Sequence, residues 1–244
     1  MKLDRKVKYV VYIITVLCVY AVLFELCRWD VKDYNVKPYD IEELLCVLSG
    51  FPPAELPMDN KISMIKWMLA LLVIFTLVGR EIYDQQNNLK YIAMVRYGSY
   101  RRFYRSLMNR TVGYVLLYGS AGMLITYVLY VCEGNGQVGD VEFLEMCMIY
   151  LSQLLLLCLL QTLCMILTQG YTASVILLLL WFVMVMCGHL VVKAGWIWIP
   201  ANWGMYIRGA KMVPGGVPDS AYYIQIGMCV LLWEGVPLVI KRKR

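Results

Sequence analysis

Residues 79–110, GREIYDQQNNLKYIAMVRYGSYRRFYRSLMNR, decide how this 244-residue chain is organised. The stretch holds seven of the 23 Lys and Arg residues and only two acidic residues, Glu81 and Asp84. On both sides it is flanked by apolar runs long enough for a helix to cross a hydrocarbon core of about 30 Å. A basic, aromatic-rich segment between two such runs is typical of a cytoplasmic surface, and we treat it as the functional centre.

The composition of the whole chain indicates a membrane protein. Hydrophobic residues make up 61% of the sequence, charged residues 16%, and the mean hydropathy is +0.62. Soluble domains have about 45–50% apolar and about 25% charged residues. We therefore predict an all-α integral membrane protein with one transmembrane domain over residues 1–244.

The spacing of the apolar runs predicts six membrane-spanning helices, and the placement of the basic residues predicts their orientation. Fifteen of the 23 Lys and Arg residues fall in the N-terminus, residues 79–110 and the C-terminus, which places both termini in the cytoplasm. Residues 28–61 and 193–219 are then the larger outer loops. The predicted spans are residues 9–26, 62–78, 111–132, 143–168, 172–192 and 221–240.

One short helix is predicted in the first outer loop. The positions of the cysteines allow one disulfide bond. Residues 40–48 have Asp40 at the N-cap and Glu43 at the capping-box position, and Gly50 with two prolines ends the pattern. Most of the nine cysteines lie inside apolar runs and behave as small hydrophobes. Those that could face an oxidising compartment are Cys27, Cys46 and Cys132.

The sequence contains no convincing nucleotide-binding or metal-binding motif. Residues 134–139 match GxGxxG, but they lie in an outer turn with no strand before them, so we interpret them as a flexible turn. The sequence has no P-loop pattern and no Cys or His spacing typical of a metal site. We expect this chain to bind neither a metal nor a cofactor itself.

A polar stripe follows one face of the fourth predicted span. Gln153, Gln161, Cys164 and Thr168 fall within about 80° of one another on a helical projection, and Tyr150 extends the stripe outward. Such a stripe either forms hydrogen bonds between helices or lines a substrate path.

Glu234 is the other candidate for the substrate path. It lies about 9 Å inside the last predicted span, because it is six residues before the end of that span. An ionisable group at the bilayer centre costs roughly 2.5–3.5 kcal/mol on insertion scales, so we expect Glu234 to have a partner or a water-filled path.

The basic stretch itself reads as two helical pieces. Residues 89–97 have helical periodicity, Gly98 and Ser99 interrupt it, and Tyr100 restarts it towards the third span. One interpretation is a basic elbow on anionic lipid, where each cation contributes about 1 kcal/mol. The Gly-Ser break and the polar run at residues 84–88 favour the other, a helix–turn–helix that reaches a soluble partner.

Two short motifs resemble a known family. VRYGSYRRF at residues 95–103 resembles the R-[IY]-G-S-[RK]-x-x-[WF] loop of bacterial ABC-2-type permeases, small six-span subunits associated with bacteriocin or peptide export and immunity. IPANWGMYIRG at residues 199–209 is similar to their IPxNWxMxxR segment before the last span. This chain has Tyr100 where the family often has a basic residue, and Gly209 where serine is common.

The resemblance implies an exporter subunit in a bacterial cytoplasmic membrane. Residues 79–110 would contain an elbow helix, steadied by Arg80 and Glu81, and a coupling helix that docks on a separate ATPase subunit. That ATPase would hold ATP and Mg, so this chain would be no enzyme, and a second permease chain would pair with it in the lipid bilayer. No nucleic-acid partner is implied.

The same resemblance assigns two sets of residues. The ATPase contact would consist of Arg96, Tyr97, Gly98, Ser99, Tyr100, Arg101, Arg102 and Phe103. Short re-entrant outer helices that close the pathway would include Pro200, Asn202, Trp203 and Arg208.

The competing class is a membrane protein that works without an ATPase, such as a sensor, an immunity protein or an intramembrane enzyme. An enzyme needs clustered acidic, histidine or nucleophilic groups, and in the predicted spans these groups are single and scattered. That pattern argues against an enzyme but leaves a sensor open.

Overall fold

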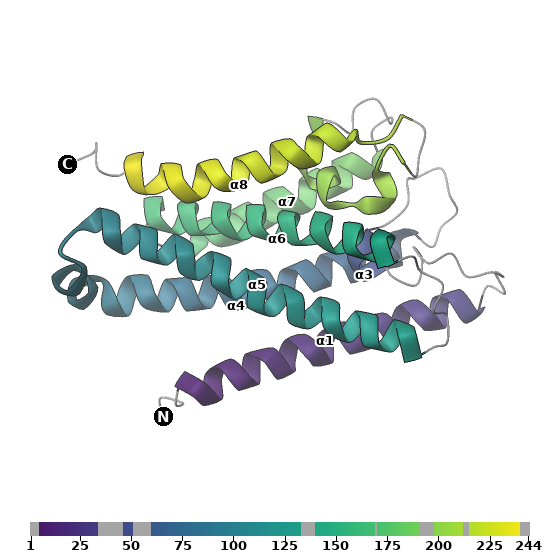
Figure 1. Ribbon diagram of the computed structural model, residues 1–244, viewed down its shortest axis with the longest axis horizontal. Helices are drawn as coiled ribbons and strands as arrows, with labels where there is room; N and C mark the ends of the chain where they lie inside the picture. The colour runs from purple at the N-terminus through teal and green to yellow at the C-terminus, as the bar shows by residue number, and fades with distance from the viewer. Residues whose placement is uncertain are drawn as a thin grey trace.

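The computed structural model describes residues 5–33, 46–50, 60–132, 140–168, 170–190, 198–211 and 215–239. Nearly all of these residues are helical, which confirms the all-α prediction (Figure 1). The α-helices are α1 (Arg5–Asp33), α3 (Cys46–Ser49), α4 (Asn60–Tyr97), α5 (Tyr100–Cys132), α6 (Asp140–Thr168), α7 (Thr172–Leu190) and α8 (Asp219–Val239). Two 3-10 helices, η2 (Pro200–Gly204) and η3 (Tyr206–Arg208), lie between α7 and α8.

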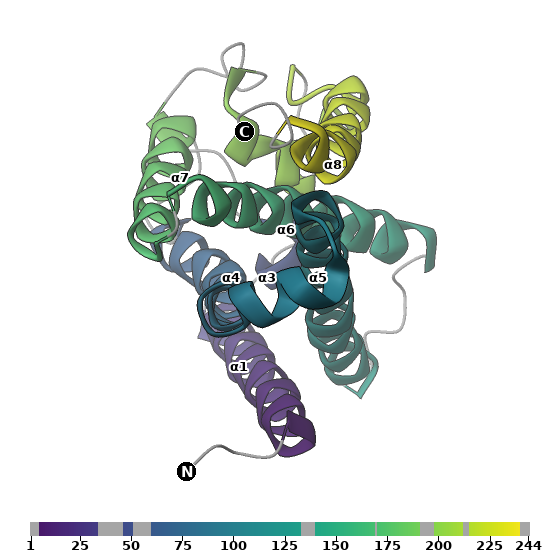
Figure 2. The ribbon, with the colours of Figure 1, turned by 90° about the vertical axis from the view of Figure 1, so that its left-hand side faces the viewer.

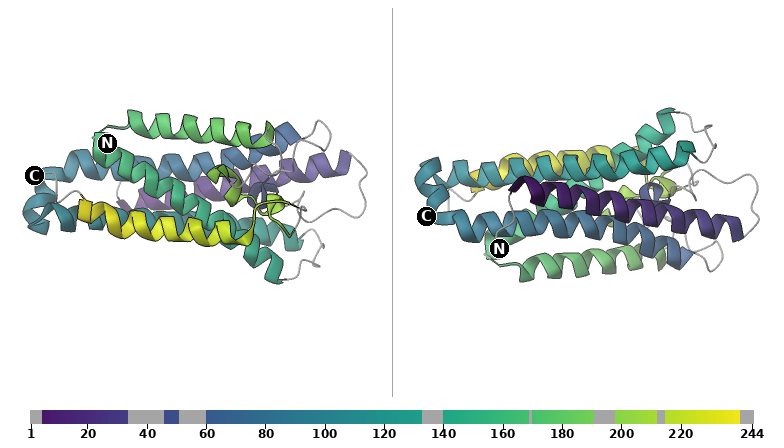
Figure 3. Two further views of the ribbon diagram at one scale, coloured as in Figure 1. Left: turned by 90° about the horizontal axis from the view of Figure 1, so that it is seen from above. Right: turned by 90° about the horizontal axis from the view of Figure 1, so that it is seen from below.

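The long helices run side by side along the long axis of the molecule (Figures 1 and 3). The start of α1, the end of α8 and the turn between α4 and α5 lie at one end, which we call the hairpin end. α3, η2 and η3 lie towards the other end (Figure 1). Central α6 contacts α4, α5, α7 and α8 (Figure 2).

Among the described residues, three helical segments are long and apolar enough to cross a membrane. They are Val7–Arg28, Tyr100–Cys132 and Glu142–Thr168, and Thr172–Cys187 is a shorter apolar helix. These segments support a membrane protein. The remaining predicted spans, residues 62–78 and 221–240, fall in α4 and α8, and the count of six spans stays a prediction.

Residues 79–110, predicted as two helical pieces interrupted at Gly98 and Ser99, are more helical than expected. α4 continues without interruption to Tyr97, and α5 begins at Tyr100, so only Gly98 and Ser99 are non-helical. No separate elbow helix forms, because residues 80–97 contain neither glycine nor proline to end α4. With 38 residues, α4 is about 57 Å long and reaches well beyond the thickness of a hydrocarbon core.

Around α3 the prediction can be followed in part. α3 ends at Ser49, and Gly50 has a φ of +96°, a left-handed conformation that favours glycine. A Cβ atom at Gly50 would also lie only 2.8 Å from Cβ of Met205, so the glycine brings α3 against the segment before η3. The predicted cap residues Asp40 and Glu43 lie outside the described residues.

None of the cysteines that the structure describes forms a disulfide bond with another. Cys27 is buried and Cys132 is exposed, and neither forms a disulfide. The side chain of Cys46 lies outside the description. Buried apolar side chains from every long helix form one main core, in which Trp67, Tyr118, Tyr150 and Trp181 are among the largest fully buried residues.

Candidate functional site

The tip of the α4–α5 hairpin is a two-residue turn. Gly98 has a φ of +66°, and nothing lies within 4 Å of the position that a Cβ atom would take there. Ser99 caps α5: its hydroxyl accepts a hydrogen bond from the Arg102 amide at 3.3 Å, and its carbonyl accepts one from the Phe103 amide at 3.1 Å. The predicted break is therefore confirmed, and its geometry is that of a capped helix start.

The residues predicted to touch an ATPase divide between surface and core. Gly98, Ser99, Arg101 and Arg102 are exposed, whereas Phe103 is 4% exposed and packs in the core. Half-buried Tyr100 stacks on Tyr104, with 6.3 Å between ring centroids. Arg96 and Tyr97 lie at the end of α4, and their side chains lie outside the description.

The electrostatics of the tip are one-sided. Arg101 and Arg102 lie in the first turn of α5, which contains no acidic residue, whereas Arg105 in the second turn is paired with Glu234 of α8. A helix N-terminus carries about half a positive charge, so basic residues there are unfavourable unless an outside anion compensates them. The tip is therefore a strongly positive surface that suits an anionic partner.

Two side-chain hydrogen bonds connect α8 to the N-terminal part of α5. The Arg105 guanidinium donates to the Glu234 carboxylate at 2.6 Å, and Trp233 Nε1 donates to Asn109 Oδ1 at 2.7 Å. Glu234 was expected to need a partner or a water-filled path, and the structure gives it a partner. Residues 129 positions apart thus connect the hairpin to the last helix.

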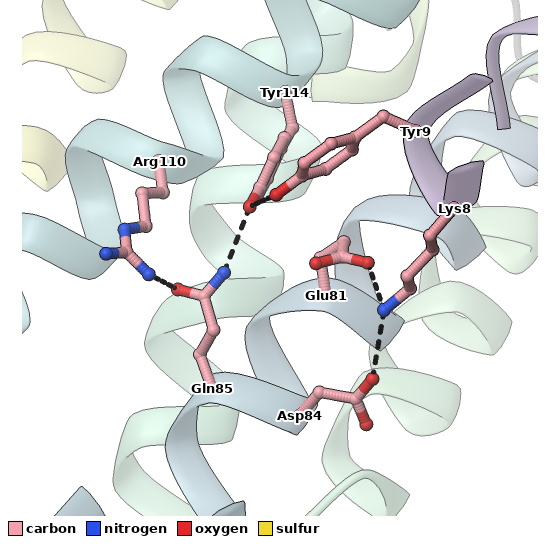
Figure 4. Close-up of polar contacts among 7 residues, drawn as sticks. All are labelled: Lys8, Tyr9, Glu81, Asp84, Gln85, Arg110 and Tyr114. Atoms are coloured by element: carbon pink, nitrogen blue, oxygen red, sulfur yellow. Dashed lines mark hydrogen bonds and ion pairs between the residues drawn. The ribbon is translucent and has the colours of Figure 1, made fainter. Parts of the chain in front are cut away.

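An ion pair connects α1 to the α4 arm of the hairpin, away from the tip (Figure 4). Lys8 of α1 forms an ion pair with Glu81 of α4 and donates to Asp84 at 3.2 Å. The Glu81 side chain is 7% exposed and that of Lys8 is 25% exposed. Glu81 is therefore a buried contact between helices, while Arg80, its predicted partner in an elbow, is exposed on α4.

A second polar chain connects the two arms of the hairpin and α1. Arg110 donates to Gln85 Oε1 at 2.5 Å, Gln85 Nε2 donates to the Tyr114 hydroxyl at 3.0 Å, and the hydroxyls of Tyr114 and Tyr9 lie 3.1 Å apart (Figure 4). Gln86 adds a contact to α6 by donating to the Met165 carbonyl at 2.9 Å. The polar run after Asp84 thus holds α4 to its neighbours.

Three of the predicted path residues on α6 form hydrogen bonds with other helices. The Tyr150 hydroxyl lies 2.5 Å from that of Tyr20 on α1, and Gln161 donates to Ser174 on α7 at 2.6 Å. Gln153 accepts a hydrogen bond from Gln225 of α8 at 2.9 Å. The remaining predicted residue, Thr168, is exposed and bonds to the Cys164 carbonyl of its own helix at 2.9 Å.

The outer segment before α8 folds around a buried arginine. Arg208 is 0% exposed and donates to Asn202 Oδ1 at 2.7 Å. Burial lowers the pKa of the Arg208 guanidinium to about 9. Pro200 begins η2, and Trp203 is buried against Val217 and Ala221. The segment therefore packs against α6, α7 and α8. The motif alone did not predict this packing.

Several contact residues were missed from the sequence. Lys8 was only one of several N-terminal charges, and Tyr9, Tyr20, Tyr114 and Gln225 carried no motif. The tyrosines at positions 9, 12 and 20 do lie close to one helical face, which is a signal that could have predicted a polar contact along α1. Their partners come from distant parts of the chain and could not be read from spacing.

The chemistry of the site is charge and hydrogen bonding. Among the described residues, no group of three or more His, Cys, Asp or Glu side chains is placed to hold a metal ion. The arrangement provides a positive surface at the tip, and hydrogen bonds and ion pairs connect the hairpin to α1, α6 and α8.

Comparisons with known proteins add no relative: no family model, no curated protein and no solved structure matches the chain. The family resemblance therefore rests on the two short motifs and enters only as a proposal.

Proposed function

We propose that this chain is the membrane-spanning subunit of an ABC-2-type transporter that exports or expels a peptide-like or amphiphilic substrate. A separate ATPase subunit binds the tip of the α4–α5 hairpin and supplies the energy. A second permease chain, identical or related, completes the substrate route. The protein lies in a bacterial cytoplasmic membrane with both termini on the cytoplasmic side.

One observation carries this proposal: the exposed arginine cluster at the capped start of α5. Arg101 and Arg102 are exposed in the first turn of α5, directly after the two-residue turn of a hairpin whose first arm is about 57 Å long. Their charge adds to that of the helix N-terminus, so the tip favours an acidic surface on a soluble partner. A helix that only lies on lipid does not need a capped turn at the end of the bundle.

The polar contacts between the hairpin and its neighbouring helices support a role in transmitting motion. A displacement of the tip is transmitted to α8 through the ion pair of Arg105 and Glu234. It is transmitted to α1 through the ion pair of Lys8 and Glu81. Such contacts let two helices follow a displacement of the hairpin without a change of fold, as rigid-body gating requires.

Co-purification tests the docking surface. The tagged chain is purified from its native membrane, and a P-loop ATPase is identified by mass spectrometry. We expect the double variant Arg101→Glu/Arg102→Glu to lose the ATPase at least about tenfold, since reversed rim charges repel an acidic partner. Lys211→Glu is the control for charge reversal elsewhere, because Lys211 is an exposed cation that follows η3, pairs with Glu145 and is remote in the fold from the hairpin tip (Figure 1). An ATPase that stays bound to the double variant, or that is absent from the wild type, would refute the proposal.

Phe103 is unsuitable for this experiment. Its ring is buried and lies 5.4 Å from that of Tyr104, so Phe103→Ala would disturb the packing of α5 as well as any docking.

Cysteine labelling tests the substrate path. Single cysteines at positions 153, 161 and 168 in a Cys-free background are exposed to a membrane-impermeant thiol reagent with and without ATP. The path is supported if nucleotide changes the labelling at 153 or 161, which are buried in the structure. Equal protection in both states would leave these residues as contacts between helices only.

A further inference from the structure

One face of α4 is exposed along much of the helix, and its chemistry changes from apolar to basic. The exposed side chains of this face fall within about 60° of one another on a helical projection. They are Ile65, Leu69, Thr76, Arg80 and Tyr83. The hydroxyl of Thr76 donates to the Val73 carbonyl at 2.9 Å, so Thr76 can also face an apolar surrounding. From Ile65 to Arg80 this α4 stripe is about 22 Å long, most of the thickness of a hydrocarbon core. Arg80 therefore lies where the apolar part of the stripe ends.

α6 and α7 hold α4 in place directly beside Arg80. A Cβ atom at Gly79 would collide with the side-chain amide of Gln161 on α6, so the backbone of α4 lies directly against that amide. The same amide nitrogen donates to the Ser174 hydroxyl of α7 at 2.6 Å. Three helices thus meet one residue before Arg80.

A pair of tyrosines lies one helical turn after Arg80. The ring of Tyr83 packs edge-to-face on that of Tyr171, with 5.7 Å between centroids and an angle of 76°. Tyr171 is anchored at the start of α7, because its carbonyl accepts hydrogen bonds from the Ser174 and Val175 amides at 3.0 and 3.3 Å. Tyrosine is enriched where a membrane meets water, so this pair suits the same boundary that the α4 stripe indicates.

Arg80 supplies a positive charge between these two contacts. The acidic residues that follow it on α4, Glu81 and Asp84, both contact Lys8 of α1. Burial raises the pKa of the Tyr171 hydroxyl, and the charge of Arg80 opposes that shift, which agrees with a guanidinium close to the tyrosine pair. Arg80, Tyr83 and Tyr171 together form a positive, aromatic surface that we call the Arg80 surface.

We propose that the Arg80 surface binds the headgroup of an anionic phospholipid from the cytoplasmic leaflet. The guanidinium matches a phosphate with two parallel hydrogen bonds, and the acyl chains lie along the apolar part of the α4 stripe. A free phosphate would satisfy the charge but would leave that stripe uncovered, so the continuity of the two favours a lipid. The inference rests on the membrane orientation of the proposed function and not on the ATPase.

A lipid held at Arg80 has a consequence for the hairpin. The helix from Arg80 to Tyr97 is about 25 Å long. Fixing the depth at which α4 leaves the bilayer therefore fixes how far the tip of the hairpin stands from the membrane. The lipid acts as a reference point for the docking surface.

Native mass spectrometry of the full chain in mild detergent tests the lipid site. The probes are phosphatidylglycerol, which is anionic, and phosphatidylcholine, which has no net charge. We expect Arg80→Gln to weaken the binding of phosphatidylglycerol about fivefold and to leave that of phosphatidylcholine unchanged. Arg102→Gln is the matched control, because it removes the same charge from an exposed arginine at the hairpin tip. Its affinity for phosphatidylglycerol should equal that of the wild type.

Three results would overturn the proposal. They are a wild-type affinity for phosphatidylglycerol in Arg80→Gln, an equal loss for both lipids, and an equal loss in Arg102→Gln. Arg80→Lys keeps the charge and should bind phosphatidylglycerol more tightly than Arg80→Gln. An equal loss in these two variants would assign the effect to packing rather than to charge, and would also refute the site.

Thermal unfolding in nanodiscs distinguishes the lipid from other anions. Phosphatidylglycerol in phosphatidylcholine nanodiscs should raise the unfolding temperature of the wild type more than that of Arg80→Gln, because a ligand stabilises the state that binds it. Inorganic phosphate added to nanodiscs of phosphatidylcholine alone should have no such effect, and an equal rise with phosphate would show a site for free anions instead.

Co-purification separates this inference from the proposed function. Arg80→Gln should retain a bound ATPase, whereas Arg101→Glu/Arg102→Glu should lose it. Loss of the ATPase from Arg80→Gln with unchanged lipid binding would assign Arg80 to the soluble partner and refute the lipid site. Absence of any ATPase, with lipid binding that depends on Arg80, would refute the transporter and leave the lipid site standing.

Discussion

The Arg105 guanidinium and the Glu234 carboxylate lie 2.6 Å apart and connect the start of α5 to the end of α8. Both side chains are nearly half exposed, at 48% and 43%. An exposed pair of this kind contributes about 0–1 kcal/mol to stability. Its importance is therefore geometric: it connects the start of the hairpin's second arm to the last helix.

Charge reversal tests the Arg105–Glu234 contact. We expect Arg105→Glu to lower the free energy of unfolding slightly, because two carboxylates then face each other. The double variant Arg105→Glu/Glu234→Arg should recover most of that loss, with a coupling energy of up to about 1 kcal/mol in a double-mutant cycle. A coupling energy of zero would show that the two side chains do not interact in the membrane-embedded protein.

Removing the Lys8 charge should have a larger effect. Lys8→Met leaves the Glu81 carboxylate buried beside apolar neighbours, whereas Lys8→Arg keeps the pair. We expect Lys8→Met to cost roughly 1–3 kcal/mol of unfolding free energy, below the 3–5 kcal/mol of a fully buried pair because Lys8 retains some water contact. Thermal or chemical unfolding in detergent measures the difference.

The control for this pair is the double variant Lys8→Met/Glu81→Gln. Because it removes both charges, its loss should be smaller than that of Lys8→Met alone. A larger loss in the double variant would contradict an ion pair at this position.

Gly122 on α5 is required by the Tyr20 ring. A Cβ atom at position 122 would lie 2.6 Å from Tyr20 Cε1, and Tyr20 is fixed by its full burial and its bond to Tyr150. Gly122→Ala should therefore destabilise the bundle by about 1–3 kcal/mol through overpacking.

Gly113 on the same helix provides the matched control. Nothing lies within 4 Å of a Cβ atom placed there, so Gly113→Ala should be neutral or stabilise by up to about 1 kcal/mol. Equal unfolding temperatures for the two variants would show that α1 and α5 do not approach each other as closely as described.

Gly98 is required by its backbone conformation alone. Its φ is +66°, and a Cβ atom would meet no neighbour within 4 Å. Gly98→Ala should cost about 1–2 kcal/mol, and Gly98→Asn should cost less because asparagine tolerates the left-handed region. Unfolding free energies that are the same for alanine and asparagine would contradict this conformation at the tip.

Much of the site was predictable from local sequence. The Gly-Ser break, the positive tip and the helical character around it follow from the residues themselves, because turn conformation and charge are local properties. The extent of α4 was not predicted, since helical periodicity in the basic segment was recognised only from residue 89 onward. The helix continues because nothing in residues 80–97 ends it, and its polar residues contact α1, α5 and α6.

By itself, the sequence determined an all-helical, apolar chain whose basic residues lie mostly at its two ends and in residues 79–110, because helical period and hydropathy act over neighbouring residues. Only the tertiary structure decided that Glu234 meets Arg105, that Lys8 meets Glu81, and that the stripe on α6 bonds to three other helices. Each of these partners comes from a different helix. Which helices become neighbours is decided by side-chain packing across the whole bundle, and no local pattern encodes it.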